Sequence, residues 1–229
     1  MNIVTGGWYN KIWKSLIKPD RAHYSPSSFG PEEQQIGQTW YCREDVELPA
    51  ILNYRIHTSL FLPDLTGDSH VASSSVHPQK HDVVLYLHTH SGNRMQGWDY
   101  LEMIEQKQLG LCVFDFHGNG KSEGDYVTFG WTETIDVDCV VKWLKRHPKV
   151  NNIILWGRSM GAVTTIFYMS PDFRTKMLHW LARYKKVNGY QFQSPETIKG
   201  VILDSPFMSL EDSILHFTNK KVRGVPNWV

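Results

Sequence analysis

The chain has 229 residues and a formal net charge of +1 at pH 7, with 41% hydrophobic and 21% charged residues. This length and composition predict one globular domain with a large core and exclude a chain that is disordered throughout. The near-neutral charge and the absence of a basic stripe in the sequence argue against nucleic acid as a partner.

The N-terminal stretch from Trp8 to Ile17 repeats apolar and aromatic residues at helical spacing, with lysines between them. This pattern predicts a helix packed on the domain, although a helix lying on a membrane surface has the same pattern. No apolar run reaches the length of a membrane span, and a signal-peptide core is lacking. The three cysteines, Cys42, Cys112 and Cys139, lie far apart, which fits a reducing compartment. We therefore expect a cytoplasmic protein with at most peripheral membrane contact.

The first part of the chain is expected to be an arm, and the rest a single domain. Residues 1–44 are interpreted as the N-terminal helix and an extended arm, and residues 45–229 as the domain. Two extended segments, 45–48 and 52–62, predict an antiparallel pair at the edge of a sheet. Residues 66–80, rich in serine, are interpreted as a surface linker.

Beyond this linker, short apolar runs alternate with amphipathic ones. The predicted order is strand 83–87, helix 94–107, strand 111–116, helix 132–146, strand 152–156, helix 159–169, strand 200–203 and helix 209–217. Apolar strands separated by helices predict an α/β fold with a mostly parallel, doubly wound sheet and helices on both faces. Residues 170–199 interrupt this order as an insertion, which is either a lid or substrate wall or a surface elaboration with its own short helix.

A G-x-S-x-G motif at residues 157–161 joins an apolar strand to a helix. In such a turn the glycines allow close backbone approach, the strained backbone exposes the serine hydroxyl, and the next amide can face an oxyanion. The motif therefore predicts acyl transfer through Ser159, with Met160 supplying an oxyanion amide. The alternative is that Ser159 only caps the following helix.

Two other turns follow predicted strands. Residues 88–94 include His88, His90 and Gly92, and a small, tight turn there suits a second oxyanion amide. A metal site at the two histidines is disfavoured because no carboxylate or cysteine lies at ligand spacing. Residues 114–124 carry three alternate glycines that match no phosphate-binding motif, so we interpret them as a turn lining the crevice.

Four segments carry a family resemblance: WGRSMGAVT at 156–164, LDSPF at 203–207, VTFGW at 127–131 and IKPDRAHY at 17–24. In these segments the chain resembles the serine-aminopeptidase-like branch of the α/β-hydrolases, as found in plants and ciliates. The resemblance implies the α/β-hydrolase fold, a nucleophile at Ser159 and oxyanion amides at Met160 and His90. It implies no cofactor, and a small-molecule, lipid or acyl-peptide substrate.

The chain departs from the family pattern at two places. Thr89 stands where the family usually has glycine, and a side chain narrows the conformational freedom of the oxyanion turn. The family's acid and histidine would follow Val229, so we expect a C-terminally incomplete chain with weak or no activity. Asp204 ends a predicted strand, where it is either the acid or, as we favour, a residue fixing the turn. Neither His179 nor His216 follows a strand end, as the histidine of a triad should.

Three hypotheses follow from these patterns. The favoured one is a serine hydrolase of ester, thioester or amide bonds that forms an acyl-enzyme at Ser159 and whose chain is incomplete. The second is a non-catalytic α/β-hydrolase-like binding protein or degenerate paralogue. The third is a peripheral membrane protein that acts on lipids or acylated proteins.

Overall fold

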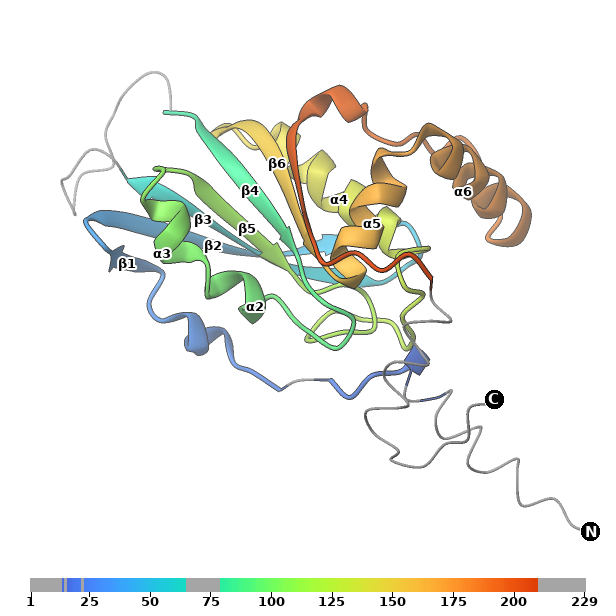
Figure 1. The fold of residues 1–229 in the computed structure, drawn as a ribbon, viewed down its shortest axis with the longest axis horizontal. Coiled ribbons are helices and arrows are strands. Elements are labelled where there is room, and N and C mark those ends of the chain that lie inside the picture. The colour runs from blue at the N-terminus through green and yellow to red at the C-terminus, as the bar shows by residue number, and fades with distance from the viewer. Residues whose placement is uncertain (1–13, 15, 22, 65–78, 210–229) are drawn as a thin grey trace, which may run out of the picture.

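A seven-stranded sheet with the order β1-β2-β3-β5-β4-β6-β7 forms the centre of the computed structural model, which describes residues 14, 16–21, 23–64 and 79–209 (Figure 1). The strands β5, β4, β6 and β7 are parallel to one another, whereas β1, β2 and β3 pair antiparallel, as do β3 and β5. The strands are β1 Glu33–Ile36, β2 Thr39–Pro49, β3 Arg55–Asp64, β4 His81–Leu87, β5 Gly110–Phe114, β6 Val150–Arg158 and β7 Ile198–Asp204. The helices are α2 Met95–Trp98, α3 Leu101–Glu105, α4 Glu133–Arg146, α5 Met160–Met169 and α6 Pro171–Tyr184, with short 3-10 helices η1 Pro26–Phe29 and η2 Pro195–Thr197.

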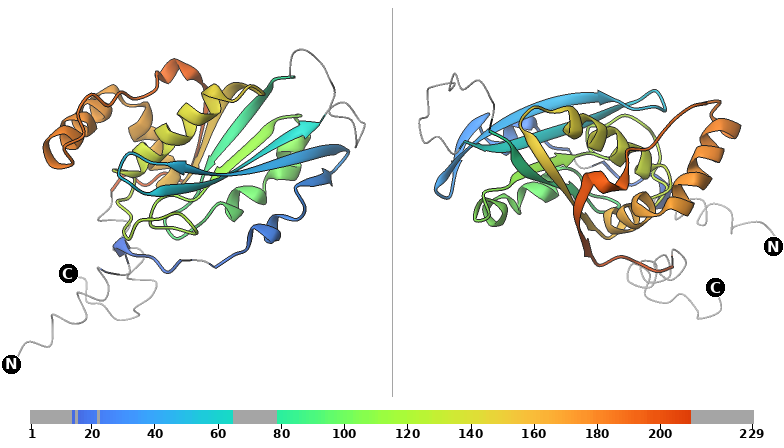
Figure 2. Two further views of the ribbon diagram at one scale, coloured as in Figure 1. Left: turned by 180° about the vertical axis from the view of Figure 1, so that it is seen from behind. Right: turned by 90° about the horizontal axis from the view of Figure 1, so that it is seen from above.

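The alternation of side chains along the central strands divides the core between two faces. On β4, Val83, Leu85 and Leu87 pack in the core that includes α4 and α5, whereas Val84 and Tyr86 pack in the core that includes α3. Figure 2 shows the two groups of helices on opposite sides of the sheet. Since both faces are covered, the inner parallel strands β4, β5 and β6 each contain a run of apolar residues. The predicted α/β fold is confirmed.

The helix predicted over residues 94–107 is two short helices, α2 and α3. A Cβ atom at Gly97 would lie 2.4 Å from Val113 Cγ1, so α2 lies closer to β5 than any other residue would allow. The Tyr100 amide donates to the Gly97 carbonyl at 3.1 Å, a bond that spans three residues rather than four and tightens the chain there. Glycine weakens a helix interior, and here it marks the point where one helix becomes two.

The sheet begins earlier than the sequence pattern indicates. β1 and the first part of β2 lie within the predicted arm, and the predicted strand over 45–48 is the later part of β2. The four residues of β1 are alternately exposed and half-buried. An edge strand of this kind carries polar residues and lacks the apolar run by which strands are recognised.

The insertion contains a longer helix than predicted. α6 has fourteen residues, and the Ser170 hydroxyl accepts a hydrogen bond from the Phe173 amide at its N-terminus. Phe173, Met177 and Leu181 are buried in a small core with Ile135 of α4. The first half of the insertion is therefore packed against the domain.

Three predicted elements fall mostly outside the described residues. These are the helix between Trp8 and Ile17, the linker at 66–80 and the helix at 209–217. Of the helices that the structure does describe, none combines the length and the hydropathy needed to cross a bilayer.

Candidate active site

The turn between β6 and α5 has the geometry that the G-x-S-x-G motif predicts. Ser159 has φ 52° and ψ −113°, a left-handed conformation that a residue with a side chain adopts only under constraint. A Cβ atom at Gly157 would lie 2.3 Å from the Gly161 carbonyl oxygen, and one at Gly161 would lie 2.1 Å from the Leu87 carbonyl oxygen. Both glycines are therefore required by the close packing of β4, β6 and α5.

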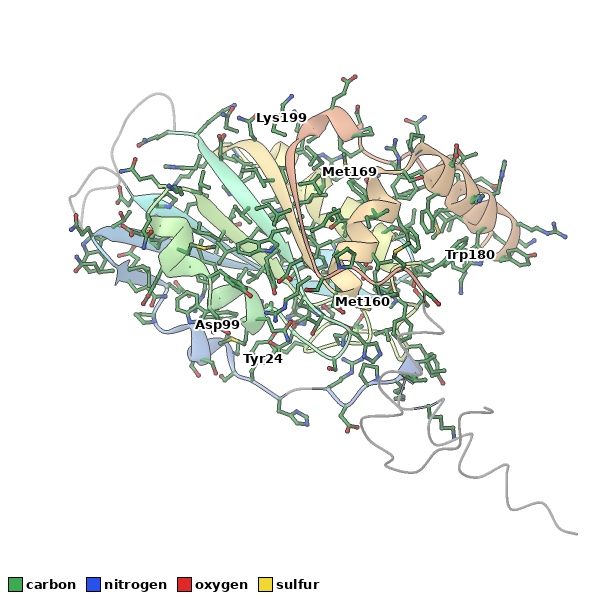
Figure 3. All side chains as sticks on the ribbon, viewed as in Figure 1. Tyr24, Asp99, Met160, Met169, Trp180 and Lys199 are labelled. Atoms are coloured by element: carbon green, nitrogen blue, oxygen red, sulfur yellow. The ribbon has the colours of Figure 1, made fainter. Side chains whose placement is uncertain are left out.

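The Ser159 side chain is half-buried and does not cap α5, since it makes no capping hydrogen bond. Its amide donates instead to the Asp204 carbonyl at 2.8 Å, which ties the turn to the end of β7. Met160 is the first residue of α5, and Figure 3 shows it beside the loops that gather at the carboxyl ends of the strands. Amides in the first turn of a helix have no partner within the helix and favour negative charge.

His88 and His90, which follow β4, have different surroundings. His88 is fully buried, and its Nδ1 donates to the Thr89 carbonyl at 2.7 Å while its Nε2 accepts from the Phe116 amide at 3.0 Å. Burial lowers the pKa of His88, so the ring is neutral and its proton lies on Nδ1. This histidine links the turns after β4 and β5 and is not available as a base.

His90 is held by its side chain and by its carbonyl. The ring Nε2 donates to the Leu16 carbonyl, and the ring stacks on Phe129 with centroids 4.6 Å apart. The His90 carbonyl accepts from Asn119 Nδ2 at 2.8 Å. Burial lowers the pKa of the His90 ring.

Asp115, which sequence reasoning did not single out, connects the turns after β4 and β5. It is fully buried, and its carboxylate accepts from the Arg94 amide at 2.7 Å, from the Lys121 amide at 2.8 Å and from the Tyr24 hydroxyl. A Cβ atom at Gly120 would lie 2.3 Å from its carboxyl carbon. Gly120 therefore lets the backbone wrap around a carboxylate of the protein itself. The sequence does contain a signal that could have identified Asp115, namely an aspartate directly after an apolar strand.

A second buried cluster surrounds His117. Its Nδ1 lies 2.6 Å from Asp136 Oδ2, and its Nε2 lies 2.9 Å from Thr132 Oγ1. Burial alone would lower the pKa of His117, but the charges of Asp136 and Glu133 and the Asp136 hydrogen bond raise it to about 9. The His117 imidazole is therefore charged at neutral pH.

Glu133 in the same cluster holds the turn that contains Phe129. It is fully buried and accepts hydrogen bonds from the Thr128 amide at 2.7 Å and the Gly130 amide at 2.8 Å. These bonds hold Phe129, at φ 55°, between them. Phe129 contacts both the His90 ring and, edge to face, the Phe207 ring with centroids 6.3 Å apart. These three rings thus form an aromatic wall next to the turn after β4.

The Asp204 carboxylate contacts Arg158 and Ser205. Its Oδ2 lies 3.4 Å from Arg158 Nε, and its Oδ1 accepts from the Ser205 hydroxyl at 2.7 Å. These contacts support the interpretation that Asp204 fixes the turn after β7. His179 is exposed on α6, and His216 lies outside the described residues. None of the hydrogen bonds of the described histidines involves Ser159.

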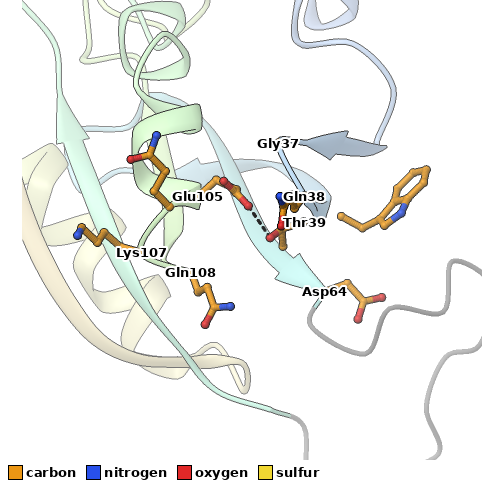
Figure 4. Close-up of a pocket in the computed structure, with 9 residues that line it drawn as sticks. Gly37, Gln38, Thr39, Asp64, Glu105, Lys107 and Gln108 are labelled. Atoms are coloured by element: carbon orange, nitrogen blue, oxygen red, sulfur yellow. Dashed lines mark hydrogen bonds between the residues drawn. The ribbon is translucent and has the colours of Figure 1, made fainter.

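A hollow lies at the other end of the sheet. It has a volume of about 680 Å³ and lies beside the β1–β2 turn, the end of β3 and the segment before β5 (Figure 4). Its lining is polar, and within it Thr39 Oγ1 donates to Glu105 Oε1 at 2.7 Å. Ligands of parallel sheets bind at the carboxyl ends of the strands, so this hollow is not the candidate active site.

Comparisons with known sequences give distant relatives. No family model matches the chain. The protein YfhR of Escherichia coli strain K12 is 23% identical over 181 residues, which cover 78% of this chain and 52% of YfhR. The lysophosphatidylserine lipase ABHD12 of Gallus gallus is 29% identical over 137 residues, covering 57% of this chain and 31% of that protein. The chain thus spans about half the length, or less, of these relatives.

Comparisons with solved structures find the same architecture. The Pyrococcus furiosus esterase Pf2001 superposes with a TM-score of 0.61 at 21% identity, covering 93% of this chain and 65% of the esterase. DcsB in complex with its substrate analogue superposes with a TM-score of 0.51 at 15% identity, covering 80% of this chain and 55% of DcsB. Together with the sheet order and the turn at Ser159, these likenesses show that the chain has the α/β-hydrolase fold.

Proposed function

We propose that this chain carries the nucleophile and the oxyanion hole of a serine hydrolase acting on ester, thioester or amide bonds. The observation that carries the proposal is the left-handed backbone of Ser159, enforced by Gly157 and Gly161 at the junction of β6 and α5. Such a strained turn is maintained at functional sites because it directs one side chain into a crevice.

The chemistry proposed at this turn is acyl transfer. Ser159 Oγ attacks the carbonyl carbon of the substrate, and the amides of Met160 and His90 donate to the resulting oxyanion. The alcohol, thiol or amine leaves, and water then hydrolyses the acyl-enzyme. Removing one such donor typically lowers kcat by about 10²- to 10³-fold, so both amides are needed.

The base that takes the Ser159 proton is proposed to come from outside the described residues. The exposure of β7 supports this, since Val201, Ile202 and Leu203 are 42%, 45% and 43% exposed although all three are apolar. A further strand beside β7 in the whole protein would cover them and place an acid and a histidine near Ser159. The half-length match to YfhR is consistent with this proposal.

The substrate is proposed to be an acyl compound, either a small ester, a lipid or an acylated peptide. The lipase name of the ABHD12 relative and the esterase name of the Pyrococcus furiosus structure support this range. The aromatic wall of His90, Phe129 and Phe207 supports an apolar acyl group. We also propose that the chain belongs to the serine-aminopeptidase-like branch, on the motifs at 127–131 and 203–207.

The test is covalent labelling of the full-length natural protein with a fluorophosphonate probe. We expect a phosphonyl adduct on Ser159, located by mass spectrometry of the peptide, together with hydrolysis of a p-nitrophenyl ester. Ser159→Ala should abolish both, whereas Ser194→Ala, at an exposed serine in the insertion, should change neither. A full-length protein whose Ser159 fails to react would instead support the non-catalytic binding protein.

A further inference from the structure

Residues 16–24, of which all but residue 22 are described, cross the loops that follow β4 and β5 (Figure 1). We call this segment the N-terminal strap. The Ile17 carbonyl accepts from the Val127 amide at 2.7 Å, whereas the neighbouring Lys18 makes only an exposed ion pair with Asp125 at 3.3 Å. At its other end the Tyr24 hydroxyl donates to the buried Asp115. The strap is therefore anchored at both ends to the loops of the candidate active site.

Arg21 lies in the middle of the strap and binds the glycine-rich turn. Its guanidinium donates to the carbonyl oxygens of Ser122 at 2.5 Å, of Gly120 at 3.4 Å and of Gly124. Three carbonyl dipoles that point at one place repel one another unless a cation lies between them, and the planar fork of arginine satisfies several acceptors at once. Arg21 thus holds the turn that contains Asn119.

The strap also binds His90 directly, because the Leu16 carbonyl accepts the hydrogen bond of the His90 ring. Asn119, in the turn held by Arg21, donates to the His90 carbonyl at 2.8 Å. Residue 90 is thus held at its ring by Leu16 of the strap and at its carbonyl by Asn119, whose turn is bound by Arg21 of the strap. Among the described residues no hydrogen bond uses the His90 amide, which leaves it available as an oxyanion donor.

We propose that the N-terminal strap is part of the active site, and that Arg21 and the His90 imidazole are positioning residues that aim the His90 amide at the oxyanion. This inference rests on the proposed function, in which that amide is a donor. In this arrangement the His90 ring, through its hydrogen bond to the Leu16 carbonyl, helps to position the amide of its own residue, which a glycine could not do. A donor misplaced by a small distance loses most of its effect on the transition state.

The test uses four single variants of the full-length protein, the double variant Arg21→Ala/His90→Ala and a p-nitrophenyl ester. Arg21→Ala and His90→Ala should each lower kcat by about 10- to 100-fold with KM within about twofold, because the amide acts in the transition state. His90→Gln, whose side-chain amide can still donate to the Leu16 carbonyl, should recover most of kcat. Lys18→Ala is the matched control, since Lys18 lies on the strap in an exposed ion pair and should stay within about twofold of wild type.

Two results would overturn the inference. One is wild-type kcat in Arg21→Ala and His90→Ala with only a lower melting temperature, which would make the strap purely structural. The other is additive losses in the double variant, because two residues that act through one donor must be non-additive.

Hydrogen exchange of the peptide covering residues 88–94 provides a readout that needs no activity. Arg21→Ala should speed exchange there and Lys18→Ala should not, and unchanged exchange in Arg21→Ala would also overturn the inference. If Ser159-dependent hydrolysis is absent while the exchange result holds, the proposed function fails but the coupling between strap and turn stands.

Discussion

The two halves of the candidate site, at the carboxyl edge of the sheet, are held in different ways. Around β4 and β5, Arg94 and Asp115 have side chains only 2% and 0% exposed and are joined by hydrogen bonds to the turns. Around β6 and β7, Arg158 and Asp204 are 49% and 35% exposed, and the last residues of β7 are open to solvent. The turns proposed to supply an oxyanion amide are thus preorganised within the described chain, whereas the surroundings of Ser159, the proposed nucleophile, depend on what covers β7.

The largest effect is expected where the two halves touch. Gly161→Ala should destabilise the fold by about 3 kcal/mol or more, because its Cβ would lie 2.1 Å from the Leu87 carbonyl oxygen of β4. Gly200→Ala on β7 is the matched control, since its Cβ would meet nothing closer than 3.4 Å, and it should change stability by less than about 1 kcal/mol. Urea denaturation measures both, and equal effects would contradict the described packing.

Removing the buried carboxylate tests the preorganised half. Asp115→Ala should cost about 3 kcal/mol, because the buried Arg94 keeps only Asp45 as an anionic partner and the Arg94 and Lys121 amides lose their acceptor. Asp125→Ala, which breaks only the exposed pair with Lys18, should cost less than about 1 kcal/mol. If denaturation midpoints of the two variants coincide, Asp115 does not organise these turns.

The pH dependence of stability tests the cluster that supports Phe129. The folded-state pKa of His117 is about 9, above the ordinary value of 6.5, so the folded protein binds the proton more tightly than the unfolded one. The resulting stabilisation, about 3 kcal/mol, is fully present below pH 6.5 and is lost as the pH rises through about 9. The difference in unfolding free energy between wild type and His117→Gln should therefore shrink between pH 6 and pH 10. A difference that stays constant over this range would show that His117 is not charged in the fold.

The smallest effect is expected in the open half. Asp204→Asn should change stability by less than about 1 kcal/mol, because the carboxylate pairs with a half-exposed arginine and the bond to the Ser159 amide uses the main chain. Ester hydrolysis by the full-length protein should stay within a few-fold of wild type. A loss of about 10⁴-fold in kcat would instead identify Asp204 as the acid of a triad.

The features that the sequence predicts correctly are those formed by residues adjacent along the chain. The turn at Ser159 is recognisable because strand, glycines, serine and helix are contiguous, and the inner parallel strands are recognisable because each contains an apolar run. β1 and the start of β2 were not predicted, since edge strands carry polar residues. The break between α2 and α3 depends on the contact of Gly97 with Val113, which no local pattern contains.

The roles of Asp115 and Arg21 could not be predicted from the sequence for the same reason. Each binds residues from a distant part of the chain, as Arg21 does in reaching Ser122 across 101 positions. Asp204 is different, since the sequence left two roles open and the contacts with Arg158 and Ser205 favour the turn. The helix predicted near Trp8 and its membrane contact lie outside the described residues and stay predictions.

The hydrogen bond from the Ser159 amide to the Asp204 carbonyl has a mechanical consequence. Ser159, the proposed nucleophile, is tied to the outermost described strand, so a small displacement of β7 along β6 would move the serine with it. A partner that binds against that strand would therefore change the position or rigidity of the Ser159 hydroxyl without contacting a substrate.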